Sequence, residues 1–319
     1  MGQHGAEMVD CVLLCPGQGS QRVGMGRDIA ERFSEARDVF QEIDDALNFS
    51  LTKIMWEGPD RTLMLTHNAQ PAILAHTIAV YSVVKQMLSP SLGAGHSLGE
   101  YSAYVAAGSL TLADAARLVR KRGELMLEAG NHRPGAMSVI LGLRISEIER
   151  CCAEARSKDQ DVVPANINSP DQTVISGDPE AVERAGALCK EAKAKRVVPL
   201  KVSGAFHSPL VEPARKGLEK MLAKTKFRDP DFPIIANATA EPVKTGSNAI
   251  GRLSDQIISP VRWVESMERA AKDTDETVSF VEVGPGTVLA GLLRKILKGR
   301  RVMSLGAGEE VSAFLEQRR

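Results

Sequence analysis

The chain has 319 residues, of which 43% are apolar and 25% charged, values typical of a soluble globular protein with one large domain or two smaller ones. Forty basic and forty acidic residues give no net charge, so no nucleic acid and no membrane is expected as a partner. The apolar stretches are too short to span a membrane. Five cysteines without a CxxC pair indicate reduced thiols and a cytoplasmic compartment, and an organellar protein whose transit peptide was removed stays open.

Strand and helix patterns alternate along the whole chain, which predicts an α/β fold. The first half is expected to begin with a buried strand at residues 11–15 and an amphipathic helix at about 28–47. A second helix should follow Pro71, and residues 91–108 should form a strand that turns into a helix. The next helix opens with the capping pair Thr111 and Asp114 and is expected to close at Gly130.

Residues 135–203 show a different pattern of predicted elements. Strands are expected at 136–143, 162–169, 172–177 and 196–203, and helices at 146–157 and 179–192. This β-α-β-β-α-β order predicts a ferredoxin-like subdomain at 134–203, inserted into a larger α/β body formed by 9–133 and 204–308. The body is expected to resume with a helix from Pro209, strands at 232–239, 278–284 and 301–306, and helices at 260–273 and 287–297.

The loop "CVLLCPGQGSQRVGMG", residues 11–26, looks like a phosphate cradle but does not fit one. The dinucleotide fingerprint would need a third glycine where Arg22 stands. A P-loop would need Lys and then Ser or Thr where the chain has Met25 and Gly26. The glycines therefore require another explanation.

The pentapeptide "GHSLG", residues 95–99, is a G-x-S-x-G pattern at the predicted strand-to-helix turn. Such a sharp elbow exposes Ser97 as a nucleophile, and the amide of Leu98 at the helix start can donate to an oxyanion. The alternative is a turn with a purely structural role.

A serine nucleophile needs a base, and His207 is the favoured candidate among six histidines. It lies between a predicted strand and a helix, the same type of position as Ser97, and such strand ends line active sites of parallel sheets. His96 is adjacent to Ser97 but points in an alternate direction around the elbow, and His76 lies on a helix face. No Asp or Glu stands out as the third member of a triad.

A charged side chain interrupts an apolar helix face at Arg122, three residues after Val119 and four before Met126. A buried guanidinium is costly unless it is paired, and it binds a carboxylate in a bidentate fork. Either an internal salt bridge or a carboxylate on the substrate would satisfy it.

Together these features resemble the malonyl-CoA:acyl carrier protein transacylases and the acyltransferase domains of polyketide and fatty acid synthases. The matching motifs run in order from about residue 10 to 305: "PGQGSQ" (16–21), "QPA" (70–72), "GHSLGEYSA" (95–103), "RG" (122–123), "GAM" (135–137), "N-x-N-S-P" (166–170), "GAFHS" (204–208), "SPVRW" (259–263) and "EVGPG" (282–286). The resemblance implies an α/β-hydrolase-like body with a parallel sheet and an inserted ferredoxin-like subdomain.

The resemblance also assigns roles to residues. Ser97 matches the acylated serine, His207 the base, and Arg122 the partner of the malonyl carboxylate. The backbone N–H of Gln18 would complete the oxyanion hole with that of Leu98, and the main-chain carbonyl of Gln256 would orient the histidine in place of an acid. Substrate contacts are implied for His96, Phe206, Met126 and Asn166, with Phe206 typical of malonyl-selective members. Leu127 departs from the family, which often has Gln there.

The implied reaction is ping-pong transfer of a malonyl group from malonyl-CoA to the phosphopantetheine thiol of an acidic acyl carrier protein. The CoA thioester is a substrate, no metal or other cofactor is implied, and a monomer is expected. Two alternatives stay open: a discrete polyketide-synthase acyltransferase with another acyl-CoA, and a serine thioesterase or hydrolase. The basic stretch at 294–301 is interpreted as a solvated helix end, with docking of an acidic partner as the second interpretation.

Overall fold

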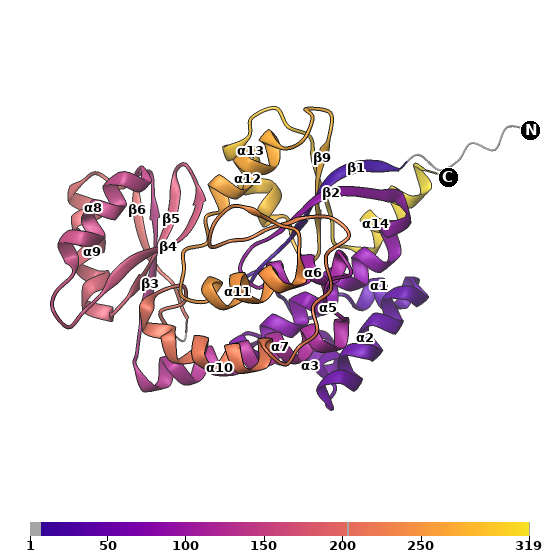
Figure 1. Cartoon of the computed structure of the whole chain (residues 1–319), viewed down its shortest axis with the longest axis horizontal. Coiled ribbons are helices and arrows are strands. Elements are labelled where there is room, and N and C mark those ends of the chain that lie inside the picture. Colours follow the sequence, from indigo (N-terminus) through magenta and orange to yellow (C-terminus); the bar gives the residue numbers. More distant parts are fainter. Residues whose placement is uncertain (1–7, 203, 319) are drawn as a thin grey trace, which may run out of the picture.

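The computed structural model describes residues 8–202 and 204–318, which form two β-sheets with helices packed on them (Figure 1). Sheet A has the strand order β10-β9-β1-β2-β7-β8, and sheet B the order β4-β5-β3-β6. The strands of sheet A are β1 (Val9–Cys15), β2 (Leu88–Gly95), β7 (Ile234–Ile235), β8 (Pro242–Val243), β9 (Ser279–Val283) and β10 (Val302–Leu305). Those of sheet B are β3 (Ala136–Leu141), β4 (Val162–Ser169), β5 (Gln172–Gly177) and β6 (Arg196–Pro199).

Helices connect the strands and cover both faces of sheet A. Before sheet B the chain forms α1 (Arg27–Arg32), α2 (Ser34–Leu47), α3 (Leu51–Glu57), α4 (Asp60–Leu63), α5 (Thr66–Val84), the 3₁₀ turn η1 (Lys85–Met87), α6 (Gly99–Ala106) and α7 (Leu112–His132). Within and after sheet B come α8 (Ile145–Ala155), α9 (Pro179–Glu191), the 3₁₀ turn η2 (Pro209–Val211), α10 (Glu212–Leu222), α11 (Gly246–Gln256), α12 (Trp263–Lys272), α13 (Val288–Ile296) and α14 (Gly308–Glu316).

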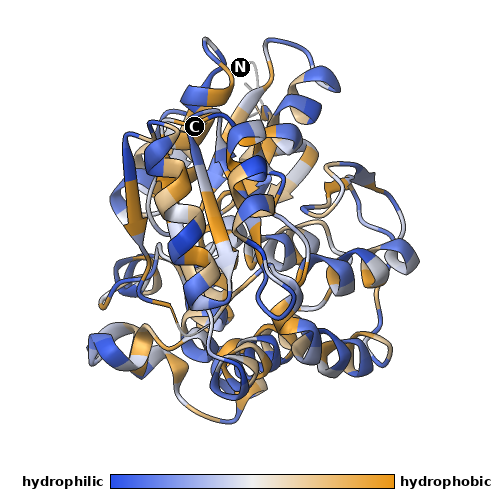
Figure 2. Cartoon of the chain, turned by 90° about the vertical axis from the view of Figure 1, so that its left-hand side faces the viewer, coloured by the Kyte–Doolittle hydropathy of each residue, from blue (hydrophilic) through white to orange (hydrophobic). Residues whose placement is uncertain are grey.

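The central strand β1 shows why sheet A is buried on both faces. It pairs in parallel with β2 on one side and β9 on the other. Cys11, Leu13 and Cys15 belong to the core that includes α2, α5, α6 and α7, whereas Val12 and Leu14 pack with α12 and α13. Alternate side chains of a strand point to opposite faces, so an uninterrupted apolar run suits a sheet covered on both sides. Figure 2 shows hydrophobic and hydrophilic residues mixed along the helices that cover it.

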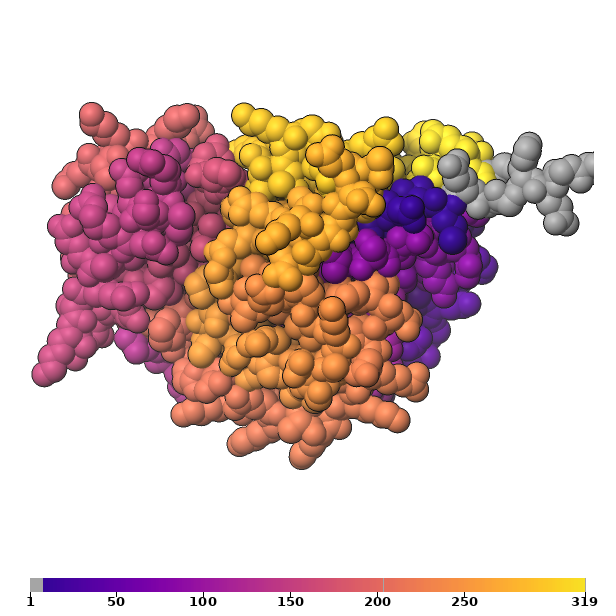
Figure 3. Space-filling view, turned by 45° about the horizontal axis from the view of Figure 1, so that its top comes forward, coloured from indigo at the N-terminus to yellow at the C-terminus, as the bar shows by residue number. Residues whose placement is uncertain are grey.

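Sheet B confirms the predicted ferredoxin-like arrangement. Its elements follow the order β3-α8-β4-β5-α9-β6, and β3 pairs antiparallel with both β5 and β6. Helices α8 and α9 bury a separate core against it, formed around residues such as Ile140, Ile148 and Ile175. In the space-filling view this part of the chain forms a lobe at one end of the molecule (Figure 3).

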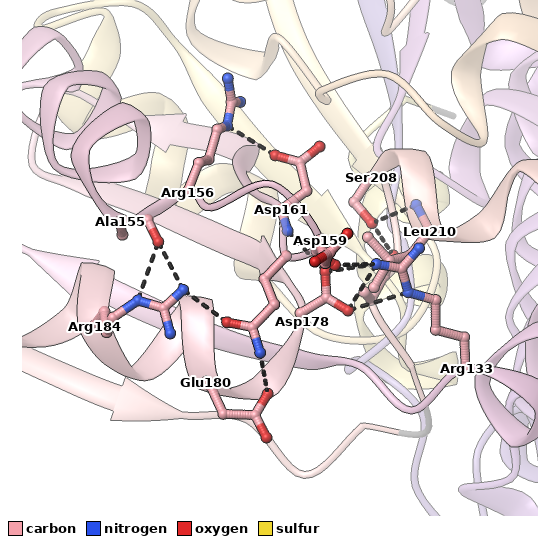
Figure 4. A network of polar contacts seen from close by, with 12 residues as sticks. Arg133, Ala155, Arg156, Asp159, Asp161, Asp178, Glu180, Arg184, Ser208 and Leu210 are labelled. Atoms are coloured by element: carbon pink, nitrogen blue, oxygen red, sulfur yellow. Dashed lines mark hydrogen bonds and ion pairs between the residues drawn. The ribbon is translucent and has the colours of Figure 1, made fainter.

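An ion pair marks the point where the chain passes from α7 into sheet B. Arg133 donates from Nη2 to both carboxylate oxygens of Asp178, at 2.9 and 2.8 Å, and Figure 4 shows the two side chains facing each other. Asp178 in turn accepts from the backbone N–H of Asp161 at 2.7 Å. The start of α9 is therefore tied both to the end of α7 and to the loop before β4.

The helix expected at 28–47 is wrong as a single helix. Phe33 has extended backbone angles, φ −125° and ψ 127°, and separates α1 from α2. The helix expected after Pro71 begins earlier, at Thr66, and contains the proline. Proline removes one helical N–H, which would have bonded to the carbonyl of His67. That carbonyl accepts instead from Arg120 Nη1 at 3.2 Å, so the helix tolerates Pro71.

Sequence reasoning also missed four helices, α3, α4, α11 and α14, and expected a longer strand than β7. Helix α14 packs against α1 and α5, and its first residue, Gly308, donates its N–H to Asp28 Oδ2 at 2.5 Å. Within the described ranges, no helix combines the length and apolar character that crossing a membrane requires.

Candidate active site

Ser97 lies on a tight turn between β2 and α6, with a positive φ of 52°. A Cβ atom on Gly95 would lie 1.9 Å from the carbonyl carbon of Gly99, and one on Gly99 would lie 2.1 Å from the carbonyl oxygen of Cys15. Only glycine fits at these two positions, which explains the G-x-S-x-G spacing. The turn presents the Ser97 hydroxyl at the carboxyl end of the parallel strands.

His207 and Ser97 form a hydrogen-bonded pair, with 2.8 Å between His207 Nε2 and Ser97 Oγ. On its other side, His207 Nδ1 lies 3.0 Å from the carbonyl oxygen of Gln256 and 3.2 Å from that of Ser259. Carbonyl oxygens only accept, so Nδ1 carries the hydrogen and Nε2 is the acceptor for the Ser97 hydroxyl. Two main-chain carbonyls therefore occupy the place where a triad would have a carboxylate.

The environment keeps His207 neutral. Burial and, to a smaller extent, the nearby Arg122 charge lower the pKa of the imidazole to about 3, against the opposing effect of the Gln256 carbonyl. A neutral imidazole with a free Nε2 lone pair is the form that can accept a proton from a serine.

Arg122 lies on the buried face of α7, as its spacing predicts, and only 1% of the residue is exposed. Its Nη1 donates to Gln70 Oε1 at 2.8 Å, and its Nη2 donates to Ser97 Oγ at 3.1 Å and to Gln256 Oε1 at 3.0 Å. Among the described residues, no carboxylate forms a direct ion pair with Arg122, and its Nε has no hydrogen-bond partner. The guanidinium lies 5.8 Å from the centre of the Tyr101 ring, and the Glu100 carboxyl acts on it only through space. The expected alternative of an internal salt bridge is therefore wrong, and a buried positive charge lies beside the nucleophile.

The side chain of Gln256 joins these groups, a role that sequence reasoning did not assign to it. Its Nε2 donates to the carbonyl oxygen of Ser97 at 2.9 Å and to Glu100 Oε2 at 2.8 Å, while its Oε1 accepts from Arg122. Because Gln256 ends α11, the helix missed from the sequence supplies both the carbonyl that orients His207 and the amide that contacts Arg122.

Asn237, from the segment after β7, fixes the elbow itself. Its Oδ1 accepts from the backbone N–H of Ser97 at 2.6 Å, and its Nδ2 donates to the carbonyl of Gly95 at 2.7 Å. The backbone N–H of Asn237 donates to Glu100 Oε2 at 3.0 Å. Asn237 was not singled out from the sequence, because nothing in its local pattern distinguishes it from an ordinary polar residue. Glu100 was not singled out either, although it lies in the "GHSLGEYSA" motif at 95–103.

The glycine-rich loop after β1 lies against the elbow. A Cβ on Gly17 would lie 2.4 Å from the carbonyl oxygen of His96, so the close approach requires glycine. In the part of the chain that the structure describes, the backbone N–H groups of Gln18 and Leu98 donate to no protein acceptor. Two free donors flanking a nucleophile are the chemical requirement of an oxyanion hole.

The loop also borders a cavity of about 170 Å³ whose lining includes Gln18, His96, Asn168 and Val288. His96 Nε2 lies 2.8 Å from Asn168 Oδ1, and the His96 ring packs on Trp263 at 5.4 Å between centroids. Burial lowers the pKa of His96. The expected contact residue Asn166 is a buried residue of β4 that forms a bridge to Val261, and Asn168, two positions further along the strand, reaches His96.

The remaining expected contact residues, Phe206 and Met126, are buried at 6% and 2% exposure. Met126 Sδ accepts a hydrogen bond from Gln70 Nε2 at 3.5 Å, and Gln70 also holds Arg122. Gln70 belongs to the "QPA" motif at 70–72, which was the available signal for its importance.

The site can perform acyl transfer to and from the serine. It combines a neutral histidine, a serine on a strained turn, two free amide donors and a buried guanidinium. The chain belongs to the acyl transferase domain family, which it matches over residues 12–314.

Two curated relatives are named malonyl CoA-acyl carrier protein transacylase. The one from Escherichia coli is 42% identical over 311 residues, covering 97% of this chain and all of that protein, and the one from Bacillus subtilis is 40% identical over 310 residues, covering 97% of each.

Solved structures agree with this assignment. An acyl carrier protein S-malonyltransferase from Vibrio cholerae superposes with a TM-score of 0.91 at 40% identity, covering 96% of this chain and 99% of the other. A malonyl-transacylase solved in complex with a type II PKS acyl-carrier protein also has a TM-score of 0.91, at 39% identity, covering 97% and 99%.

Proposed function

We propose that this protein transfers a malonyl group from malonyl-CoA to the phosphopantetheine thiol of an acyl carrier protein through an acyl-Ser97 intermediate. The observation that carries the proposal is the position of Arg122, a buried guanidinium 3.1 Å from Ser97 Oγ without a carboxylate partner among the described side chains. An acyl group with a free carboxylate would supply that partner, whereas an acetyl group would leave the charge unpaired.

In the first half-reaction, Ser97 Oγ bonds to the thioester carbonyl carbon while His207 Nε2 takes the hydroxyl proton. The N–H groups of Gln18 and Leu98 hold the resulting oxyanion. Collapse of the tetrahedral intermediate breaks the carbon–sulfur bond, and the CoA sulfur leaves with the proton from His207.

The second half-reaction repeats these steps in reverse. The phosphopantetheine thiol gives its proton to His207 and attacks the acyl-serine, and Ser97 recovers the proton as the carbon–oxygen bond breaks. Since the His207 Nδ1 hydrogen is held by the carbonyls of Gln256 and Ser259, the ring presents Nε2 in both halves.

The thioester arm would reach Ser97 between the two sheets. The cavity beside Gln18 is lined from both, with His96 from the body and Asn168 and Gln172 from the segment of sheet B. We propose that residues 134–203 form a subdomain inserted in a body of 9–133 and 204–308, with α14 packed on that body. We also propose a monomeric, cytoplasmic enzyme, and the five free, buried cysteines support the reducing compartment.

The intact mass of the protein after brief incubation with malonyl-CoA tests the proposal, with Ser97→Ala alongside. A single malonyl adduct on the wild type and none on Ser97→Ala is the expected result. An adduct that persists on Ser97→Ala would reject Ser97 as the nucleophile, and free malonate without an adduct would favour the hydrolase alternative.

A further inference from the structure

A buried carboxyl group with no part in the proposed chemistry lies directly behind the nucleophile. Glu100, in the first turn of α6, is fully buried, although it is three residues from Ser97. Its Oε2 accepts two hydrogen bonds, at 3.0 Å from the backbone N–H of Asn237 and at 2.8 Å from Gln256 Nε2. Its Oε1 has no partner within the described chain.

The two residues that Glu100 holds are the ones that position the reacting groups. Asn237 binds the backbone N–H of Ser97 and the carbonyl of Gly95, on both sides of the elbow. Gln256 orients His207 through its carbonyl and contacts Arg122 through its Oε1. One carboxyl oxygen thus connects the supports of all three active groups.

The acceptor at Glu100 also helps to fix which way the Gln256 amide points. An amide presents an acceptor on one side and a donor on the other, and its two orientations have nearly the same shape. With Oε2 of Glu100 and the Ser97 carbonyl as neighbours, the amide nitrogen must face them, which leaves its oxygen toward Arg122 Nη2. The reverse orientation would place donor against donor at Arg122.

We propose that Glu100 is a positioning residue that fixes Gln256 and Asn237, and through them Arg122, His207 and Ser97, in the geometry for malonyl transfer. The inference rests on the proposed function. Burial raises the pKa of Glu100 to about 7, although its two donors and the Arg122 charge act in the opposite direction. Either protonation state keeps an acceptor oxygen at Oε2, so positioning depends on the oxygen atom and not on the charge.

Three substitutions at Glu100 should differ in their effect on malonylation. Glu100→Gln retains an acceptor at the same distance from the backbone, so single-turnover malonylation of Ser97 should stay within about fivefold of wild type. Glu100→Met has similar length without that acceptor and should slow malonylation about 10- to 100-fold. Glu100→Asp is one methylene shorter, cannot reach both donors, and serves as the second test if Glu100→Met does not fold.

Loss of stability alone predicts a different result. Ile148→Ala opens the separate core of α8 and sheet B and is the control for general destabilisation. Glu100→Met should lower the preference for malonyl-CoA over acetyl-CoA, because Arg122 loses its fixed partner, whereas Ile148→Ala should leave that preference unchanged. In addition, Glu100→Met combined with Gln256→Met should cost less than the product of the two single losses, since the two variants share the Glu100–Gln256 contact and only the Glu100 bond to Asn237 is lost separately.

The experiment is rapid-quench measurement of Ser97 acylation with malonyl-CoA and acetyl-CoA for these variants. A slow, less selective Glu100→Met or Glu100→Asp, a near-normal Glu100→Gln and non-additivity with Gln256→Met support the proposal. Equal rates and selectivity for wild type and Glu100→Met or Glu100→Asp, or fully multiplicative losses with Gln256→Met, overturn it. If the wild type itself forms no malonyl adduct, the proposed function has failed instead.

Discussion

Replacing Arg122 by Met should convert a malonyl-selective site into one that favours acetyl groups. Methionine has similar length and packs well in a buried site, but it can donate no hydrogen bond. The substitution removes the donor to Ser97 Oγ and leaves Gln70 Oε1 and Gln256 Oε1 without their partner. The acyl-serine chemistry at Ser97 and His207 uses neither of these two oxygens.

The size of the effect follows from the bonds that the malonyl carboxylate would make. Two charge-assisted hydrogen bonds contribute about 1.5–3 kcal/mol each. Arg122 donates to Ser97 Oγ and Gln256 Oε1 through Nη2, so a bound carboxylate would replace part of an existing set of bonds. Two such bonds would contribute about 3–6 kcal/mol, and we expect the lower half of this total. Since about 1.4 kcal/mol corresponds to a factor of ten, kcat/KM for malonyl-CoA should fall about 100- to 1,000-fold.

The assay compares kcat/KM for malonyl-CoA and acetyl-CoA, with Arg117→Met as the control. Arg117 is an exposed arginine of the same helix that pairs with Asp114 at 3.2 Å, so its loss changes the net charge equally without touching the site. Acetyl transfer by Arg122→Met should change by less than about tenfold. Equal losses with both substrates would refute the role of Arg122 in recognising the carboxylate.

Two further predictions concern the glycine-rich loop after β1 and the buried His76. Gly17→Ala should push the Gln18 loop off the elbow, because its Cβ would lie 2.4 Å from the His96 carbonyl oxygen, and should slow Ser97 acylation about 100- to 1,000-fold in a rapid-quench assay. Gly251→Ala, whose Cβ meets nothing within 4 Å, is the matched control, and an unchanged rate in Gly17→Ala would count against the oxyanion hole. Burial lowers the pKa of His76 to about 4, so the unfolded state binds the extra proton between pH 4 and 6.5 and stability falls as the pH falls. In urea titrations, the free energy of unfolding of the wild type should fall by about 2 kcal/mol more than that of His76→Gln between pH 7 and pH 5. An equal fall in both proteins would contradict this prediction.

Local patterns in the sequence singled out Ser97, His207 and Arg122, which the structure brings together. Glycines two residues to either side of Ser97 predict the sharp turn, and Arg122 is recognised as a charged residue on the apolar face of a helix. His207 follows from its place at a strand end, although its supporting carbonyls belong to residues about fifty positions away. The β-α-β-β-α-β order of sheet B and its two helices was equally local and is confirmed.

The supporting residues were not predictable in the same way. Asn237 and Gln256 lie 140 and 159 residues from Ser97, and only tertiary folding brings them to it. Helix α11, "GSNAIGRLSDQ", has glycine, serine and asparagine in its first turn and a second glycine inside, and packs Ala249 and Leu253 into the core. Its helical state is decided by that burial, which a local pattern does not display.

The fate of isolated malonyl-enzyme tests the central claim most directly. The adduct would be separated from free malonyl-CoA and divided between buffer alone and buffer with phosphopantetheinylated acyl carrier protein, and malonate and malonyl-carrier would be measured over time. A transferase should keep its adduct in buffer and pass the malonyl group to the carrier protein within the dead time of mixing by hand. Rapid release of malonate at the same rate in both samples, with no malonyl-carrier formed, would contradict the account and identify the protein as a hydrolase.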